Sequence, residues 1–148
     1  MMKGAVYGDT HGERSLGRGF KVGKRVHEAG ERGVRGSYSF LSRFESGKGT
    51  NPEELIGAAH AGCYSMALSH MLASGGFTPK KVQTTANVSL EKVGDGFKIT
   101  KIELNMEAQV PGIDNNKFME FAEKAKTGCP VSQALAATPI TLKAKLSS

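Results

Sequence analysis

Residues 43–63, RFESGKGTNPEELIGAAHAGC, decide how the chain is organised. An extended segment ends in a Ser-Gly-Lys-Gly-Thr loop, and a helix then begins at Pro52. Asn51 suits the N-cap position, and Pro52 suits the first helical position because its missing N–H would be unpaired there anyway. Glu53 and Glu54 fall in the first turn, where carboxylates complement the positive end of the helix dipole. The sequence therefore predicts a helix with a well-specified start.

This helix is predicted to extend to about Ala73, and it is rich in small residues. Apolar and small side chains recur along it at three- and four-residue steps, which predicts one buried face. The predicted face consists of Ile56, Ala59, His60, Cys63, Met66, Ala67 and His70. Gly75 and Gly76 supply the stop signal. We expect a tightly packed helix that has Cys63 on its buried side and small residues that let another backbone come close.

Length and composition indicate a globular protein. The chain has 148 residues, 39% of them hydrophobic, which is enough for one domain with a sizeable core. It has no run of about 18 apolar residues and no signal-peptide pattern, so we expect a cytoplasmic protein that does not enter a membrane. Two cysteines in such a chain indicate a thiol role or plain burial rather than a disulfide scaffold. We treat residues 1–148 as a single domain.

The net charge of +6 is concentrated near the N-terminus, because the first 50 residues hold ten Lys and Arg against five Asp and Glu. Residues 1–35 are basic and rich in glycine. A basic patch of this kind could bind nucleic acid or another ligand. No recognition-helix pattern or aromatic stacking platform accompanies it, so we favour solvated strands and loops over a nucleic-acid-binding module.

A β-hairpin is predicted after the helix. Val82–Val93 and Phe97–Val110 are rich in Val, Ile and Thr, and a Gly-Asp-Gly turn joins them. The apolar alternation of the second strand needs a slip near Lys101, which a bulge would supply.

The other elements are predicted from capping, periodicity and turn signals. Asp114 caps a predicted helix over Asn115–Lys126, and Cys129-Pro130 opens a short helix that ends near Ala136. The strands predicted outside the hairpin are Lys3–Tyr7, Gly19–Val26, Gly36–Ser42 and Ile140–Leu146. Strands and helices in this order predict one α+β domain.

Cys63 and Cys129 differ in their local surroundings. Cys129 precedes Pro130 at an N-cap position, where backbone N–H groups and the helix dipole favour a thiolate. Cys63 lies about three turns inside its helix and has no such help. If Cys63 is a nucleophile, its thiolate needs another positive partner, and Arg43 is the candidate that we favour.

Glu53 cannot contact Cys63 of its own chain if the helix is straight. Ten residues separate them, about 15 Å along the axis and roughly 80° around it. A shared site would need Glu53 from a second copy of the chain, packed against the small-residue face. The alternative, which the spacing alone favours, is that Glu53 only complements the helix dipole.

The histidines allow two other kinds of site. His60, Cys63 and His70 lie at i, i+3 and i+10, so only the first two could share a metal. Even with Cys129 the ligands barely suffice for zinc, and no CxxC or HxxxH spacing supports a metal site. His60 and Cys63 could also form a hydrolase dyad. We expect no metal and interpret His60 as a helix-packing residue at an interface.

Two motifs together are specific for a family. The stretch RFESGKGTNPEELIGAAHAGCYSMALSHML and the later KAKTGCPVSQAL resemble the osmotically inducible protein C (OsmC) branch of the OsmC/Ohr peroxidases. Similarity runs from about Tyr38 to the C-terminus and includes the hairpin VSLEKVGDGFKITKIEL, whereas residues 1–35 match poorly. The resemblance implies an α+β fold with antiparallel sheets packed around a long central helix. It also implies an intertwined homodimer with each active site at the subunit interface.

The same resemblance implies a thiol-dependent peroxidase of the oxidative and osmotic stress responses. Its substrates would be organic hydroperoxides and, more weakly, hydrogen peroxide. Cys63 matches the peroxidatic cysteine and Cys129 the resolving one, while Arg43 and Glu53 match the pair that activates the thiolate. The implied cycle passes through a Cys63 sulfenic acid and a Cys63–Cys129 disulfide, which an external dithiol reduces. No cofactor or metal is implied.

Overall fold

The computed structural model describes residues 2–4, 7–9, 21–24, 32–35, 39–45 and 47–147. The elements, in chain order, are β1 (Met2–Gly4), β2 (Tyr7–Asp9), β3 (Lys21–Lys24), β4 (Arg32–Arg35), α1 (Phe40–Phe44), α2 (Pro52–Ser74), β5 (Lys81–Val93), β6 (Gly96–Gln109), α3 (Asn115–Gly128), α4 (Pro130–Ala134) and β7 (Ile140–Ser147). Within the described ranges, no helix has both the length and the apolar character needed to cross a membrane.

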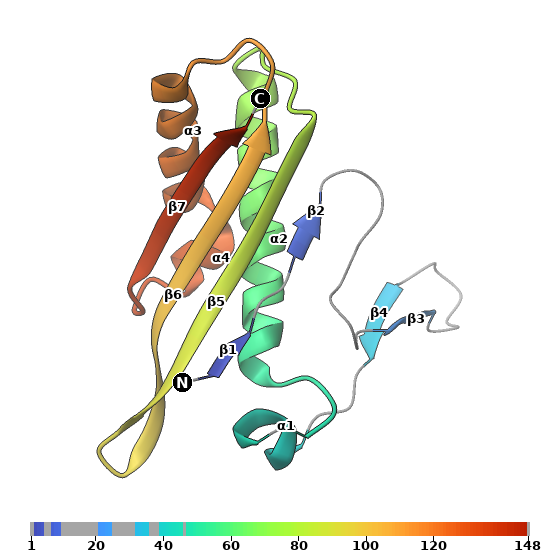
Figure 1. Ribbon diagram of the computed structural model, residues 1–148, viewed down its shortest axis with the longest axis vertical. Helices are drawn as coiled ribbons and strands as arrows, with labels where there is room; N and C mark the ends of the chain where they lie inside the picture. Colours follow the sequence, from blue (N-terminus) through green and yellow to red (C-terminus); the bar gives the residue numbers. More distant parts are fainter. Residues whose placement is uncertain are drawn as a thin grey trace.

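A five-stranded sheet forms one layer of the described structure, and helices form the other. β5 and β6 make a long antiparallel hairpin, and β1 and β2 pair antiparallel with the free side of β5. β3 and β4 form a separate antiparallel pair. Helices α2 and α3 lie on the same face of the large sheet, with α2 alongside β5 (Figure 1). The α+β class is therefore confirmed.

β7 departs from the predicted antiparallel arrangement. It pairs with β6 in parallel, with Ile102 opposite Ile140 and Gln109 opposite Ser147. Parallel pairing requires a crossover connection, and α3 and α4 together supply it. The prediction of antiparallel sheets was therefore wrong for this strand.

The predicted β-hairpin is confirmed, including its slip. Gly94 lies in the turn with a φ of 60°, a conformation that glycine adopts freely. Ser89 pairs with Lys101, and the register shifts directly afterwards. The bulge thus falls where the apolar alternation of the second strand required it.

The predicted helix starts are also confirmed, and the helix ends lie within two residues of the predicted ones. The Asn51 side chain accepts a hydrogen bond from the backbone N–H of Glu54 at 2.8 Å, and α2 begins at Pro52. Gly75 is the C-cap of α2, and Gly76 follows with a φ of 84°. In the same way Asp114 caps α3, and Cys129 occupies the N-cap of α4.

The buried face of α2 is not the predicted one. The residues of α2 that are buried in the chain are Glu53, Gly57, His60, Ala61, Tyr64, Ser65, Leu68 and Leu72. Of the predicted face, His60 is buried and three residues are half-buried, namely Ile56, Cys63 and Ala67. Ala59 and His70 are exposed, and Met66 is 69% exposed. Small residues occur on all sides of α2, so the periodicity of its apolar residues does not identify one buried face. The large side chains decide instead, because they contribute most of the apolar area that is removed from water.

Gly57 shows why α2 carries small residues on its buried face. A Cβ atom at this position would lie 3.0 Å from the carbonyl oxygen of Ala86 on β5. The helix therefore approaches the backbone of the sheet closely there. The expectation of a close backbone approach is confirmed at this residue.

The N-terminal strand predictions had mixed outcomes. The predicted strand Gly36–Ser42 was wrong over residues 39–42, because Ser39 is the N-cap of the short helix α1. Residues 36–38 lie outside the described residues. Ser39 and Ser42 cap each other reciprocally at 2.8 and 3.0 Å. This side-chain capping stabilises a helical turn where the alternation of serine with apolar residues suggested a strand.

The other two N-terminal strand predictions are confirmed in part. β1 and β2 cover both ends of the predicted Lys3–Tyr7 strand, and residues 5 and 6 lie outside the described residues. β3 lies inside the predicted Gly19–Val26 strand, whose ends also lie outside them. The strand β4 was not predicted.

The core fills the space between the helices and the sheet. Its largest fully buried apolar side chains are Tyr64, Leu68, Leu72, Val82, Val88, Ile102, Leu104 and Phe118. The Tyr64 hydroxyl donates to the carbonyl of Ala122 at 3.1 Å, which joins α2 to α3. These contacts fix the position of α3, and α4 follows it directly in the chain.

Replacement of Phe118 by Ala tests this packing. Phe118 is 0% exposed, and its truncation leaves a cavity between the helices and the sheet. We expect Phe118→Ala to lower the free energy of unfolding by about 3–5 kcal/mol in denaturant titration. Val93→Ala is the control, because Val93 is 53% exposed and should cost less than about 1 kcal/mol. Equal losses in the two variants would contradict the assigned core.

Candidate active site

The two cysteines lie side by side, although 66 residues separate them in the chain. Cys63 projects from the middle of α2 and is half-buried, while Cys129 is fully buried at the N-cap of α4. Their Sγ atoms are 2.9 Å apart, and the Cys129 thiol donates a hydrogen bond to the Cys63 sulfur. Both cysteines are free. Since a disulfide bond is about 2.05 Å long, a movement of about 1 Å brings the sulfurs to bonding distance.

The first turn of α4 affects the pKa of Cys63, although Cys129 is the residue at its N-cap. Burial raises the pKa of the Cys63 thiol, and the hydrogen bond with Cys129 raises it further. The backbone N–H of Val131, in the first turn of α4, donates to Cys63 and lowers this pKa. From the sequence we expected this helix start to favour a thiolate at Cys129, which is its N-cap but makes no side-chain capping hydrogen bond. The expectation that Cys63 has no such help was wrong, because the first turn of α4 also lies at Cys63.

Arg43 and Glu53 form the second predicted pair. Arg43 Nε donates to Glu53 Oε2 at 3.2 Å, and Nη2 donates to Oε1 at 2.6 Å, so the ion pair is bidentate. The Glu53 side chain is 4% exposed and the Arg43 side chain 35%. The hydrogen bonds that Arg43 donates to Glu53 raise the pKa of Arg43, and the negative charge of Glu53 adds to that effect. Arg43 is thus a fixed cation with one open side.

Hydrogen bonds fix α1, which carries Arg43, to the start of α2, which carries Glu53. The Ser42 hydroxyl donates to the carbonyl of Thr50 at 2.8 Å, and the Asn51 amide donates to the carbonyl of Ser42 at 3.3 Å. Ser42, Thr50 and Asn51 are all buried or at the limit of burial. The geometry of the ion pair therefore depends on the loop between α1 and α2.

Within one chain the two pairs of residues lie apart. Glu53 and Cys63 belong to the same continuous helix, Pro52–Ser74, and ten residues separate them. At 1.5 Å per residue this places them about 15 Å apart along the axis. The structure therefore joins Arg43 with Glu53, and Cys63 with Cys129. It does not join the ion pair to the sulfurs of the same chain.

His60 contacts α4 and not the sulfur of Cys63. Its Nε2 lies 2.8 Å from the Ser132 hydroxyl, and its Nδ1 has no hydrogen-bond partner within the described part of the chain. Burial lowers the pKa of His60, which favours the neutral imidazole. The hydrolase dyad of His60 and Cys63 therefore finds no support in the geometry. His60 is indeed a packing residue, but here it packs inside the chain.

The sequence analysis did not identify Ser132 as part of this site. A usable signal existed, because Ser132 follows Cys129 at the same three-residue spacing by which Cys63 follows His60. For metal binding, the described residues contain no group of three or more His, Cys, Asp or Glu side chains that could hold an ion. The basic side chains of residues 1–35 belong to the undescribed part of the structure, so the binding-module hypothesis stays a prediction.

An exposed aromatic cluster lies beside the arginine. The ring centroids of Phe40 and Phe44 are 4.7 Å apart, and those of Phe44 and Phe97 are 4.9 Å apart. The Arg43 guanidinium carbon lies 5.2 Å from the centroid of the Phe44 ring. Phe40 and Phe97 are 70% and 59% exposed, so the open side of the cation borders apolar surface.

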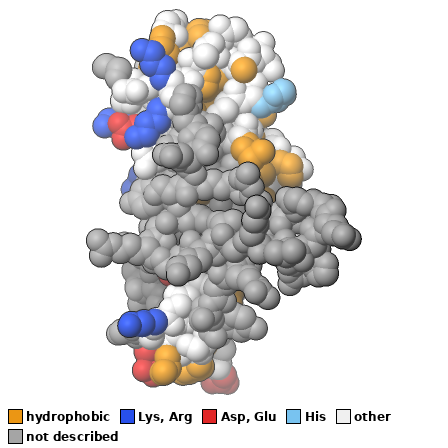
Figure 2. Space-filling view, turned by 90° about the vertical axis from the view of Figure 1, so that its right-hand side faces the viewer, with side chains coloured by type: hydrophobic (Ala, Val, Ile, Leu, Met, Phe, Trp, Pro, Cys, Tyr) orange, Lys and Arg blue, Asp and Glu red, His pale blue; other side chains and the backbone are white. Residues whose placement is uncertain are grey.

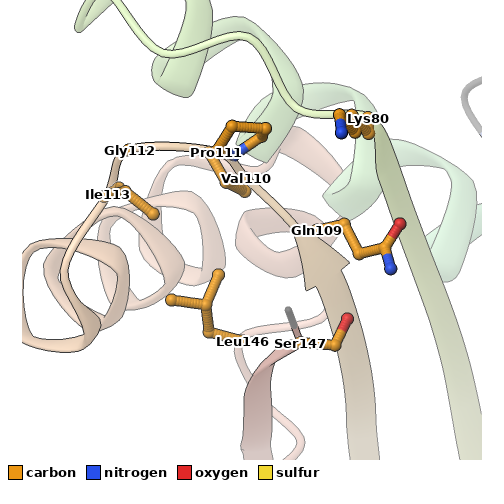
Figure 3. Close-up of a pocket in the computed structure, with 8 residues that line it drawn as sticks. All are labelled: Lys80, Gln109, Val110, Pro111, Gly112, Ile113, Leu146 and Ser147. Carbon is orange, nitrogen blue, oxygen red and sulfur yellow. The ribbon is translucent and has the colours of Figure 1, made fainter.

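A separate hollow of about 490 Å³ lies at the end of the sheet where β6 and β7 finish (Figure 3). It is lined by Lys80, Gln109, Val110, Pro111, Gly112, Ile113, Leu146 and Ser147. None of the four predicted site residues is among them. The predicted chemistry therefore lies elsewhere, on α1, α2 and α4.

The sequence is similar to those of known proteins. Residues 45–145 match the OsmC-like protein family. The Escherichia coli K12 protein named Peroxiredoxin OsmC is 62% identical over 111 residues, which cover 75% of this chain and 77% of that protein. The organic hydroperoxide resistance protein of Xanthomonas axonopodis pv. citri is 34% identical over 89 residues, with 60% of this chain and 61% of that protein covered.

Solved structures share the fold. An organic hydroperoxide resistance protein OsmC from Legionella pneumophila matches with a TM-score of 0.57 and 25% identity, and the match covers 80% of this chain and 82% of that chain. OhrB of Bacillus subtilis matches with a TM-score of 0.53 and 29% identity, covering 68% and 73%. The fold, the match over residues 45–145 and the 62% identity together show that the chain belongs to the OsmC-like protein family.

Proposed function

We propose that the protein is a thiol-dependent peroxidase that reduces organic hydroperoxides and, more weakly, hydrogen peroxide. The observation that carries this proposal is the pair of free sulfurs, Cys63 and Cys129, held 2.9 Å apart. The relatives named peroxiredoxin and organic hydroperoxide resistance protein support the reaction class. The exposed phenylalanines beside Arg43 support a preference for peroxides with an apolar substituent, because such a substituent would bury apolar surface on binding.

The proposed chemistry needs two sulfurs and an external dithiol. The Cys63 thiolate attacks one oxygen of the hydroperoxide, the O–O bond breaks, and the leaving alkoxide takes a proton to become an alcohol. Cys63 is then a sulfenic acid. The Cys129 sulfur attacks the Cys63 sulfur, the S–O bond breaks, and water leaves as the disulfide forms. A dithiol reduces the disulfide by thiol–disulfide exchange, and the scheme uses no resident metal or cofactor.

Activation of Cys63 supports a homodimer. In the single chain, burial and Cys129 raise the pKa of Cys63, whereas a reactive thiol needs its pKa lowered by a nearby cation. Arg43, fixed by Glu53, is suited to that task, but Glu53 lies about 15 Å along α2 from Cys63 of the same chain. We therefore place the Arg43–Glu53 pair of one copy at the Cys63 of the other.

The exposed side of α2 supports the same assembly. Apolar and small residues form a stripe along it, consisting of Leu55, Ala59, Met66 and Ala73. Leu55 is 40% exposed and Met66 is 69% exposed. Hydrophobic side chains are also visible on the side of the molecule that Figure 2 presents. In an intertwined dimer this stripe would be covered, and α2 would become the central helix between two sheets.

We further propose that residues 1–148 form a single domain of a cytoplasmic protein. Residues 1–35 would contribute its basic, glycine-rich strands and loops. The strands β1 and β2 support this reading, because both pair with β5 of the main sheet. A peroxidase of this kind would serve in the oxidative and osmotic stress responses.

Removal of each sulfur tests the reaction. We expect Cys63→Ser to abolish the consumption of cumene hydroperoxide, because no nucleophile remains. Cys129→Ser should still consume the first equivalent but should accumulate overoxidised Cys63, since no second sulfur condenses with the sulfenic acid. Stopped-flow peroxide consumption with intact-mass analysis measures both. An unaltered peroxide rate in Cys63→Ser would refute the assignment.

Removal of the arginine tests the activation of the thiolate. Loss of a cation near Cys63 should raise its pKa, and neighbouring opposite charges typically shift a pKa by about 1–3 units. In a Cys129→Ser background, Arg43→Ala should therefore slow iodoacetamide alkylation of Cys63 at least about tenfold near neutral pH. The difference should disappear at a pH above both thiol pKa values. Lys117→Ala is the control, because Lys117 pairs with exposed Glu120 on α3. Identical pH profiles for the parent and Arg43→Ala would remove the proposed role.

Mixing the inactive Cys63→Ser variant with the slowed Arg43→Ala variant tests the shared site. Cys63→Ser supplies Arg43 without the nucleophile, and Arg43→Ala supplies Cys63 without the cation. In a two-fold dimer, random mixing should restore roughly a quarter of the parent activity, because each mixed dimer contains one complete site. The measurement is peroxide consumption after the variants are unfolded and refolded together. If each site lay within one chain, the mixture would show only the mean activity of the two variants, which would exclude the shared arrangement.

A further inference from the structure

Two side-chain contacts join α2 to α4, and they have the same spacing on both helices. His60 and Cys63 are three residues apart on α2, and Cys129 and Ser132 are three residues apart at the start of α4. His60 Nε2 meets the Ser132 hydroxyl at 2.8 Å, and Cys63 Sγ meets Cys129 Sγ at 2.9 Å. The two contacts are thus about 4.5 Å apart along the axis of α2, and they run in opposite chain directions on the two helices.

The His60–Ser132 contact is as deeply buried as the sulfur pair. His60 is 0% exposed and Ser132 is 6% exposed. The Nδ1 atom of His60 lacks a hydrogen-bond partner within the described part of the chain. A buried polar atom without a partner is unfavourable, and an apolar side chain at this position would avoid that cost. The presence of an imidazole here therefore indicates that His60 has a role beyond packing, through its hydrogen bond with Ser132.

The element that this bond holds is short. α4 has five residues and carries Cys129 at its N-cap. A helix of this length is not stable by itself, so its position depends on the contacts that it makes with its neighbours. Among the hydrogen bonds of the described residues, three link α4 to α2: His60 with Ser132, Cys63 with Cys129, and the Val131 N–H with Cys63. The last two both involve the Cys63 sulfur, whereas the first does not.

We propose that His60 and Ser132 are positioning residues for the resolving step, and that their hydrogen bond keeps Cys129 within reach of the oxidised Cys63. The inference rests on the proposed peroxidase function. Oxidation of Cys63 to a sulfenic acid changes both contacts of the Cys63 sulfur with α4. The hydrogen bond between His60 and Ser132 does not involve that sulfur, so it continues to hold α4 on α2. The Cys129 sulfur remains in place to attack the Cys63 sulfur, with formation of the disulfide and release of water.

The competing reaction makes this role measurable. A sulfenic acid that waits for Cys129 meets a second peroxide molecule and becomes a sulfinic acid. A positioning residue for the resolving step should change the ratio of disulfide to sulfinic acid. This ratio is set after the sulfenic acid has formed, so it does not depend on the rate of the first reaction of Cys63 with peroxide. A residue that only stabilises the fold would not change this ratio.

Ser132→Ala is the primary test, and Ser65→Ala is its matched control. Ser65 donates a buried hydrogen bond of 2.8 Å to Thr84, which joins α2 to β5 and not to α4. After one equivalent of cumene hydroperoxide, we expect Ser132→Ala to form the disulfide about fivefold more slowly than the parent, the factor typical of one lost hydrogen bond. The sulfinic acid fraction in excess peroxide should rise. Quenched-flow trapping and intact-mass analysis measure both quantities.

Two further variants complete the experiment. Ser132→Thr keeps the hydroxyl and should restore the parent ratio, and His60→Gln, which keeps a side-chain donor, provides a second test if Ser132→Ala does not fold. Disulfide rates in Ser132→Ala that equal the parent rate, or that fall equally in Ser65→Ala, would overturn the inference. A parent protein that consumes no hydroperoxide would instead refute the proposed function, and the inference with it.

Discussion

One rigid helix determines how the site of this protein is divided. α2 runs without interruption from Pro52 to Ser74, and it carries Glu53 in its first turn and Cys63 near its middle. The fixed rise of an α-helix keeps these side chains about 15 Å apart along the axis, and no rotation of side chains closes that distance. The carboxylate that fixes Arg43 and the sulfur that needs a cation therefore lie in separate places within one chain. The proposed second copy of the chain follows from this separation.

The Arg43–Glu53 ion pair contributes more to the geometry of the site than to the stability of the fold. A carboxylate that is 4% exposed is costly to remove from water, and an ion pair commonly only offsets that cost. What the pair supplies is geometry, because two parallel N–H···O bonds fix the plane of the guanidinium. The hydrogen bonds of Ser42 and Asn51 then hold α1 on the start of α2. A cation fixed in this way, with a third of its surface open, is prepared for an anionic partner.

Local sequence signals predicted most helices and strands, but they did not predict the contacts between segments that are distant in the chain. The caps Asn51 and Asp114 and the slip near Lys101 were predictable because each depends on a few neighbouring residues. The buried face of α2 was not predictable from periodicity, since alanine and glycine occur on all its sides. The contact of His60 with Ser132 spans 72 residues and depends on where α4 docks. The identities of the site residues came from the family resemblance, and the structure supplied the neighbours of each one.

The raised pKa of Cys63 and the close approach of Cys129 are properties of the same packing. Burial against α4 brings the sulfurs within 2.9 Å, and the same burial disfavours the thiolate on which the first step depends. A site inside one chain would have to compromise between the two requirements. In the proposed dimer they are separated, because α4 of the same chain supplies the resolving sulfur and the second copy supplies the cation. A chain without its partner would then hold Cys63 mainly as a thiol, and its reactivity toward peroxide would depend on assembly.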